Sequence, residues 1–226
     1  MNLSYADDMV LLTPAMSALK KLLKICETYA ESHGLRYNAK KTELLMFRPQ
    51  GGHVGAVPPA FLSANKIKRV SQFKYLGHWL TDDLSDGVDV ERERRALAVK
   101  CNMLGRRFAR CTKQVKISLF KAYCQSFYTC SLWVKYTQRT LNTIRVQYNN
   151  GFRMLMGLPR HCSASGMFAE TRTDGFHAII RKLVASLAQR VRGTNGILTV
   201  VSNRLDCPFQ KHWMELHVRA PIQSRM

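Results

Sequence analysis

The sequence predicts an α+β fold in which short strands and a covering helix precede a mostly α-helical block. Three observations carry this prediction. The apolar run Met9–Leu12 is short and follows a polar turn, which is typical of a buried strand. Residues 14–33 place leucines at helical spacing with lysines on other faces, which indicates an amphipathic helix that covers a sheet. From residue 88 onward helical spacing dominates, and residues 141–155 keep it through four turns.

Helix-capping and loop-forming residues predict where the elements of the first part begin and end. Thr13 and Pro14 predict the helix start, as N-cap and first helical residue, and Gly34 offers a left-handed cap after the last turn. Residues 44–47 predict a second short strand. Residues 49–59 are rich in glycine and proline and therefore predict a loop.

Residues 67–80 predict a β-hairpin or a bent strand pair, with Gly77 at a bulge or at a close approach of the backbone. Residues 81–87 predict an acidic turn. Beyond it, helices are predicted at residues 89–110, 113–135 and 175–191.

The change of character near residue 88 predicts the domain organisation. We expect a small α+β domain at residues 1–87, a helical domain at 88–160, and a weakly helical C-terminal extension at 161–226.

Composition excludes several classes of protein. The 226 residues are 46% hydrophobic, which excludes a disordered or fibrous chain. No apolar run approaches 18 residues, and the N-terminus lacks a basic region ahead of an apolar one. We therefore expect neither a transmembrane segment nor a secretory signal, and an intracellular location.

The seven cysteines are odd in number, widely spaced and without a CxxC pair, which favours free thiols in a reducing compartment. Cys207, His212 and His217 provide three potential zinc ligands without a nearby fourth, so we interpret their spacing as chance.

The charge balance favours a polyanionic partner. Thirty-five Lys and Arg face fifteen Asp and Glu, which gives a net charge of +20 and a pI near 10.1. A phosphate backbone is the expected partner for such a field. A membrane surface is the rival, but the basic residues are spread along the chain rather than gathered beside one apolar helix.

Asp7 and Asp8 are the first candidates for chemistry. Adjacent carboxylates at a strand turn repel one another, and a divalent cation removes that conflict. Two Mg²⁺ ions held in this way can activate a 3′-hydroxyl and stabilise a leaving pyrophosphate. An ordinary Asp-Asp turn is the alternative, and four residues alone would favour it.

The order and spacing of the motifs decide otherwise. Three motifs in this order resemble the C-terminal half of a reverse transcriptase palm. They are Tyr5-Ala6-Asp7-Asp8, the stretch from Gly34 to Glu43 with Lys40-Lys41-Thr42, and Phe73-Lys74-Tyr75-Leu76-Gly77. The resemblance is closest to the enzymes of non-LTR (LINE-type) retrotransposons. It continues through Arg106-Arg107-Phe108, Lys121 to Tyr128 and Leu158-Pro159-Arg160, and covers roughly residues 3–170.

The resemblance implies a partial polymerase palm followed by a thumb-like helical block and a post-thumb region. It implies that Asp7 and Asp8 bind Mg²⁺ or Mn²⁺ and that Lys41, or alternatively Lys40, lies near the incoming dNTP. The hairpin around Lys74, Tyr75 and Gly77 would grip the primer end. An RNA template and a DNA primer are the implied partners, two-metal nucleotidyl transfer is the implied reaction, and the nucleus is the implied location.

Basic and aromatic residues support a nucleic-acid interface. Residues 89–116 hold nine basic and three acidic residues. The candidates for contacts with a duplex backbone are Arg106, Arg107, Arg110, Lys113 and Lys116. For each of them a solvated helix face is an equal alternative. Tyr5, Tyr75 and Trp79 are candidates for packing on sugar or base faces, with core packing favoured for Trp79.

Family polymerases need a third carboxylate on an earlier strand, and only six residues precede Asp7. Asp82, Asp83 and Asp86 lie beyond the primer-grip hairpin and could not replace it. We therefore expect a fragment from the distal part of a retrotransposon reading frame that is inactive alone. A non-catalytic nucleic-acid-binding module and a decayed element copy remain alternatives.

Overall fold

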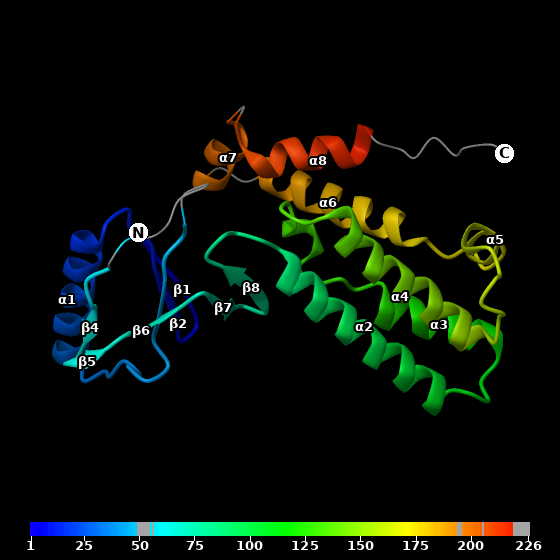
Figure 1. Ribbon diagram of the computed structural model, residues 1–226, viewed down its shortest axis with the longest axis horizontal. Coiled ribbons are helices and arrows are strands. Elements are labelled where there is room, and N and C mark those ends of the chain that lie inside the picture. The colour runs from blue at the N-terminus through cyan, green and yellow to red at the C-terminus, as the bar shows by residue number, and fades with distance from the viewer. Residues whose placement is uncertain (49–54, 56, 194–195, 205, 219–226) are drawn as a thin grey trace. The chain divides into compact units, whose positions relative to one another are not determined.

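The computed structural model describes residues 1–48, 55, 57–193, 196–204 and 206–218 (Figure 1). The chain divides into two compact units. The first contains residues 1–75 and 80–84, and the second contains residues 76–79 and 85–226. The division runs through one β-hairpin, so the tip of that hairpin belongs with the helices that follow it in sequence.

The first unit combines one helix, α1 (Met16–Ser32), with very short strands. The strands are β1 (Asn2–Tyr5), β2 (Asp8–Leu11), β3 (Glu43–Leu45), β4 (Phe61–Leu62), β5 (Asn65–Lys66), β6 (Lys68–Val70) and β7 (Gln72–Tyr75). β1 pairs with β2 and β4 with β5, both antiparallel, whereas β3 and β6 are parallel. β7 pairs with β8 (His78–Thr81).

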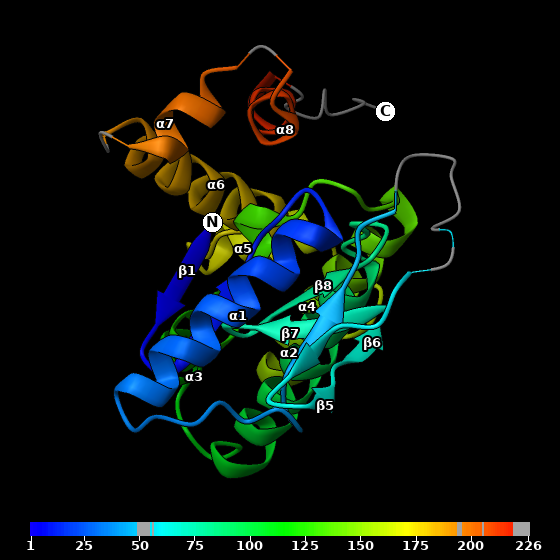
Figure 2. The same cartoon turned by 90° about the vertical axis from the view of Figure 1, so that its left-hand side faces the viewer.

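The core of the first unit is small. Leu19 and Leu23 of α1 are buried with Ala60, Leu62 and Ile67, and α1 packs against β4. In Figure 2, where α1 faces the viewer, the helix runs across the strands of this unit. Every residue of β1 is exposed. Little apolar surface is therefore removed from water at the N-terminus, and burial of such surface is the main source of stability.

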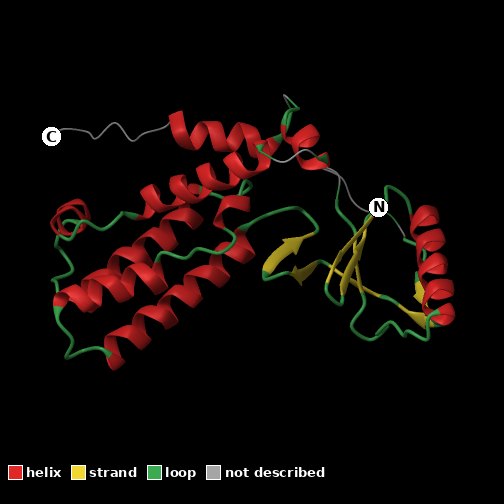
Figure 3. Cartoon of the chain, turned by 180° about the vertical axis from the view of Figure 1, so that it is seen from behind, coloured by secondary structure: helices red, strands yellow, loops and turns green. Residues whose placement is uncertain are grey.

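Helices dominate the second unit, as the red ribbons of Figure 3 show. They are α2 (Gly87–Arg107), α3 (Lys113–Cys124), the short 3₁₀-helix η1 (Cys130–Leu132), α4 (Gln138–Met156), α5 (Ala164–Glu170), α6 (Phe176–Arg192), α7 (Ile197–Ser202) and α8 (Pro208–Val218). The sequence provides several of their ends. Thr112 and Thr137 cap α3 and α4 by accepting the backbone N–H three residues later, and Gly157 ends α4 in the left-handed region at φ 67°.

The second unit has a much larger core. Among the described residues, twenty-three buried ones form one cluster, centred on aromatic rings of α3, α4 and α5. Helices α2 and α4 run in the same direction, since Gly151 lies against Cys101 and Gly105 lies against Met154. A Cβ at Gly151 would collide with the Sγ of Cys101, so glycine is required for this close approach.

The α+β fold class is confirmed, while several predicted boundaries were wrong. Helix α1 begins at Met16, because Thr13 Oγ1 donates to the Ala15 carbonyl (3.2 Å) instead of capping the helix. The strand predicted at 9–12 is half-buried rather than buried, and that at 44–47 ends at Leu45.

The helix predicted at 113–135 ends at Cys124. Phe127 and Thr129 are buried in the following segment, so tertiary contacts override the helical pattern there. Most of the loop predicted at 49–59 lies outside the described residues.

Limited proteolysis of the full chain tests the difference between the two cores. We expect thermolysin, which cleaves at apolar residues, to remove residues 1–50 first and to leave a fragment that retains α2 to α6, because the smaller core opens more readily. Mass spectrometry identifies the surviving fragment. Survival of a fragment that lacks the C-terminal helices would contradict this account.

Candidate metal-binding turn and nucleic-acid interface

The Tyr5–Asp8 turn connects β1 to β2, with Tyr5 and Asp8 opposite one another in the antiparallel register. Ala6 and Asp7 form the two-residue connection, and Ala6 adopts the left-handed region at φ 52°. The pairing extends to the other end of the hairpin, where the backbone groups of Met1 and Leu12 exchange hydrogen bonds of 2.9 Å. All four turn residues are exposed, so both carboxylates are open to solvent.

The chemistry of this turn suits a hard divalent cation. Asp7 and Asp8 offer only oxygen ligands, which Mg²⁺ and Mn²⁺ prefer. None of the salt bridges among the described residues involves either carboxylate. No group of three His, Cys, Asp or Glu able to hold a metal occurs in the described part of the chain. The turn therefore provides two carboxylate ligands at one exposed point.

Lys40 and Lys41 lie in a turn that Asn38 organises. The Asn38 carbonyl accepts the backbone N–H groups of Lys41 and Thr42, each at 3.1 Å, and its Oδ1 accepts that of Lys41 at 3.2 Å. Both lysines are exposed. Lys40 helps to line a shallow pocket of about 440 Å³ bounded by residues 36–40 and Asn65. Of the two lysines, Lys40 is the one that lines this pocket, and the predicted role of Lys41 stays a prediction.

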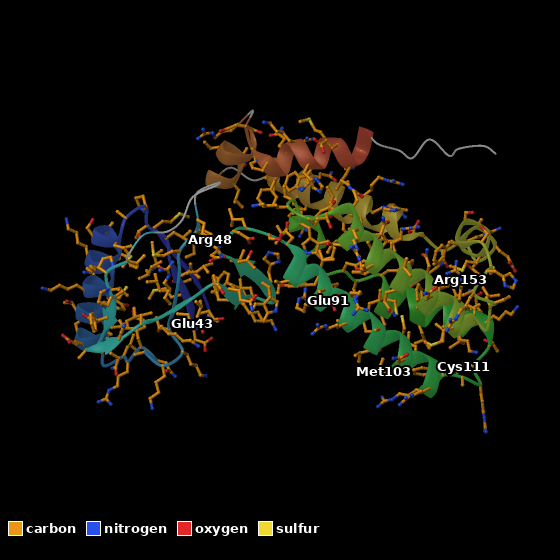
Figure 4. The ribbon with its side chains drawn as sticks, viewed as in Figure 1. Glu43, Arg48, Glu91, Met103, Cys111 and Arg153 are labelled. Carbon is orange, nitrogen blue, oxygen red and sulfur yellow. The ribbon has the colours of Figure 1, made fainter. Side chains whose placement is uncertain are left out.

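The β7–β8 hairpin carries the predicted primer contacts. Lys74 is exposed and Tyr75 is half-buried. In the first unit, the end of β8 is held by a bidentate ion pair in which Arg48 Nε and Nη2 each lie 2.8 Å from the Asp82 carboxylate (Figure 4 labels Arg48). The Arg48 backbone N–H also donates to the Asp82 carbonyl at 2.7 Å. The segments that follow β3 and β8 are therefore held together by these contacts.

Leu76 and Gly77 form the hairpin tip, with φ values of 46° and 85°. A Cβ at Gly77 would lie 3.1 Å from Cε1 of Tyr128. Of the two roles predicted for Gly77, the close approach is therefore the one that occurs.

Asp89, in the first turn of α2, connects the hairpin tip to the helices of the second unit. Its side chain is fully buried. Oδ1 accepts the backbone N–H of Trp79 at 3.2 Å and Arg92 Nε at 2.8 Å. Oδ2 accepts Trp133 Nε1 at 2.8 Å and the Thr129 hydroxyl. One carboxylate thus accepts hydrogen bonds from four residues that lie at different positions in the sequence.

The electrostatics of Asp89 follow from these contacts. Burial alone would raise its pKa, but the close His78 imidazole and hydrogen bonds from Arg92, Thr129 and Trp133 outweigh it and hold the pKa well below its usual range. A depressed folded-state pKa stabilises the fold above the unfolded value of about 3.9, and the stabilisation is lost only as the pH falls toward the folded value. Asp89 is therefore an anion throughout the neutral range.

The other acidic residues of α2 are also paired. Arg94 and Arg95 each contact Glu91, at 2.7 and 2.9 Å, and Arg92 Nη1 lies 3.0 Å from Glu93. The Arg94 guanidinium is the main cause that lowers the pKa of Glu91 to about 2. The first half of α2 is thus electrically compensated.

The segment that follows the paired residues of α2 is not compensated. Residues 101–169 contain eleven Lys and Arg and no Asp or Glu. Arg106 and Arg107 end α2, Arg110 lies in the next connection, and Lys113 begins α3. These four are exposed, Lys116 is half-buried, and no salt bridge of the described residues includes any of the five. The predicted backbone-binding residues therefore gather around the α2–α3 connection.

The α2–α3 connection lies at the same end of the unit as the C-terminus of α4, because α2 and α4 are parallel. Cys111 and Arg153 mark this end in Figure 4. Basic residues at the end of α2 favour its dipole, but Lys113 at the start of α3 opposes the dipole of that helix. The Lys113 charge therefore slightly destabilises the start of α3.

The remaining sequence candidates have defined places. The Tyr5 side chain is exposed, and Trp79 is half-buried. All seven cysteines are free. His212 Nε2 lies 3.2 Å from the Tyr136 hydroxyl, and His217 Nδ1 lies 2.7 Å from the Trp213 carbonyl, so both imidazoles already have partners. Within the described residues, no helix is long and apolar enough to cross a membrane.

Sequence reasoning missed two residues of this region. The sequence identifies Asp89 only as one of three acidic residues in a basic helix, although an acid in a first helical turn is a recognisable signal of a helix start. The helix predicted at 113–135 includes Tyr128. Its exposure follows from the end of α3 at Cys124, for which the sequence offers no glycine or proline signal.

Comparisons with known proteins concern the first part of the chain. Residues 2–80 match the family model of reverse transcriptase (RNA-dependent DNA polymerase). Comparison with curated proteins gives no match, and neither does comparison with solved structures. The matched segment contains the Tyr5–Asp8 turn, Lys41 and the tip of the β7–β8 hairpin. The family match thus covers the segment that holds the candidate metal-binding turn.

Proposed function

We propose that this chain provides the metal-binding turn, the primer-holding hairpin and the nucleic-acid-binding helices of an RNA-directed DNA polymerase of the non-LTR retrotransposon type. The observation that carries the proposal is the family match at residues 2–80, within which Asp7 and Asp8 lie exposed at a hairpin turn. The retrotransposon type rests on the resemblance of the ordered motifs and of the thumb-like segments that follow them.

The proposed chemistry is two-metal nucleotidyl transfer. Asp7 and Asp8 would hold the divalent ions, which when bound lower the pKa of a primer 3′-hydroxyl and neutralise charge on the leaving pyrophosphate. Lys41 would contribute positive charge near the incoming dNTP. The hairpin around Lys74, Tyr75 and Gly77 would fix the primer end, since orientation of the two reactants is a large part of catalysis.

The second unit would bind the duplex of RNA template and DNA primer. The exposed cations around the α2–α3 connection lack acidic partners among the described residues, so they are available to phosphates. Phosphate contacts of this kind position a nucleic acid without reading its sequence. This location favours Arg106, Arg107, Arg110, Lys113 and Lys116 as the contacts.

We further propose that the chain binds a primer–template but does not extend it alone. The resemblance implies that polymerases of this family use a third carboxylate beside the two of the turn. The nucleic-acid-binding role does not require that carboxylate, because it depends on the charge of the second unit.

Substituting Arg106→Gln and Arg107→Gln together tests the interface. We expect weaker binding of a primer–template and a fall of about 1–2 in the magnitude of the slope of log K against log salt, because each lost phosphate contact removes about 0.9 from it. Fluorescence anisotropy over a salt series measures both quantities.

The matched control for that experiment is Arg94→Gln with Arg95→Gln. It removes the same charge from the same helix, but both guanidinium groups are already paired with Glu91. An equal loss of slope in the two variants would show that net charge, and not the α2–α3 connection, determines binding.

Primer extension on an RNA template tests the catalytic proposal. We expect the full chain with Mg²⁺ and labelled dNTP to give no incorporation while it still binds the primer–template, with an active reverse transcriptase assayed in parallel. Incorporation that disappears in Asp7→Asn/Asp8→Asn would mean that a competent site forms, and the proposed inactivity would be wrong. Absence of both incorporation and binding would contradict the proposed function and favour a decayed copy.

A further inference from the structure

Tyr128 is the most solvent-exposed large side chain of the segment between α3 and η1. Its side chain is 72% exposed, whereas its neighbours Phe127 and Thr129 are each only 3% exposed. A single exposed aromatic residue needs no explanation by itself. What distinguishes Tyr128 is that the residues on both sides of it are anchored in the second unit.

Three contacts fix the segment. Gln125 Nε2 donates to the Tyr148 hydroxyl at 3.0 Å, and the Phe127 ring packs edge-on against Phe176 with centroids 5.5 Å apart. The Thr129 hydroxyl donates to the buried carboxylate of Asp89. The backbone at position 128 is therefore held in place, and the ring is presented to solvent from a rigid support.

The ring also lies against the hairpin tip. A Cβ added to Gly77 would lie 3.1 Å from Cε1 and 3.5 Å from Cδ1 of Tyr128, so the ring occupies the space that a side chain at position 77 would need. Leu76, beside Gly77, is 40% exposed. The tip and the ring together form an exposed apolar surface, and both belong to the second unit.

The charge around this surface does not oppose a polyanion. Asp89 is enclosed by donors, and Glu93 contacts Arg92 at 3.0 Å and Lys100 at 3.8 Å. Lys100 Nζ also lies 3.5 Å from the Ser126 carbonyl, two residues before Tyr128. These two acidic groups are thus compensated, and an ammonium group lies beside the backbone of the segment that carries Tyr128.

We infer that Tyr128 is a stacking platform for an unpaired nucleobase of the strand held at the hairpin tip. This inference rests on the proposed function, because it requires that the chain binds nucleic acid. An aromatic ring can stack on any base, so the site would not select a sequence. Because the backbone that carries the ring is already held in position, ordering of this segment on binding costs little conformational entropy.

The test uses the full chain and a primer–template whose primer ends in one unpaired 2-aminopurine nucleotide. We expect Tyr128→Leu to weaken binding about 5- to 150-fold, the range given by loss of one stacked base. It should also abolish the quenching of 2-aminopurine fluorescence. The slope of log K against log salt should stay unchanged, because no charge is removed. Tyr128→Trp should retain both affinity and quenching.

Tyr123→Leu is the matched control. Tyr123 is 48% exposed on α3, and no ring contact or side-chain hydrogen bond is found for it within the described residues. Equal affinity and equal quenching in the two leucine variants would overturn the inference, while binding by the unsubstituted chain would leave the proposed function standing. If the unsubstituted chain does not bind, the proposed function fails and the inference with it. Thermal unfolding midpoints equal to that of the unsubstituted chain show that each variant is folded.

Discussion

The organisation of the second unit depends on one buried carboxylate. Asp89 lies in the first turn of α2, yet its donors come from the hairpin tip, from α2 and from the segment after α3. A buried anion without partners would be very costly, so these donors must remain in place for the unit to fold. The constraint explains why residues 76–79 belong with the helices and why the ring of Tyr128 lies beside Gly77.

The same arrangement separates charge along α2. Its three acidic residues all lie in the first half of the helix and are paired, whereas Arg106 and Arg107 at the far end have no acidic partner among the described residues. Basic side chains without an acidic partner among the described residues therefore lie at the α2–α3 end of the helix. Under the proposed function, the hairpin tip and this cationic end would contact different parts of a nucleic acid, the base and the phosphate backbone.

Patterns of local origin were predictable from the sequence. The amphipathic helix α1, the hairpin near Gly77 and the helices α2, α4 and α6 follow from spacing and punctuation. What escaped prediction depends on contacts distant in sequence. The β4–β5 turn uses Ser63 and Ala64 at positive φ without a glycine signal. Helix α3 ends at Cys124, ahead of the buried Thr129, whose hydroxyl donates to Asp89. The Asp7-Asp8 motif and the basic residues were evident in the sequence, but the role proposed for Tyr128 could be inferred only from the fold.

Asp89→Asn tests the central constraint most directly, with Glu91→Gln as a control that removes one charge from a half-buried residue of the same helix. We expect Asp89→Asn to lower the free energy of unfolding of the second unit by about 3 kcal/mol, because the buried Arg92 contact loses its anion. The amide of Trp79 should exchange with solvent faster, because it donates to Asp89. Glu91→Gln should change stability by less than about 1 kcal/mol. Equal denaturant midpoints and equal Trp79 exchange in the two variants would contradict this account.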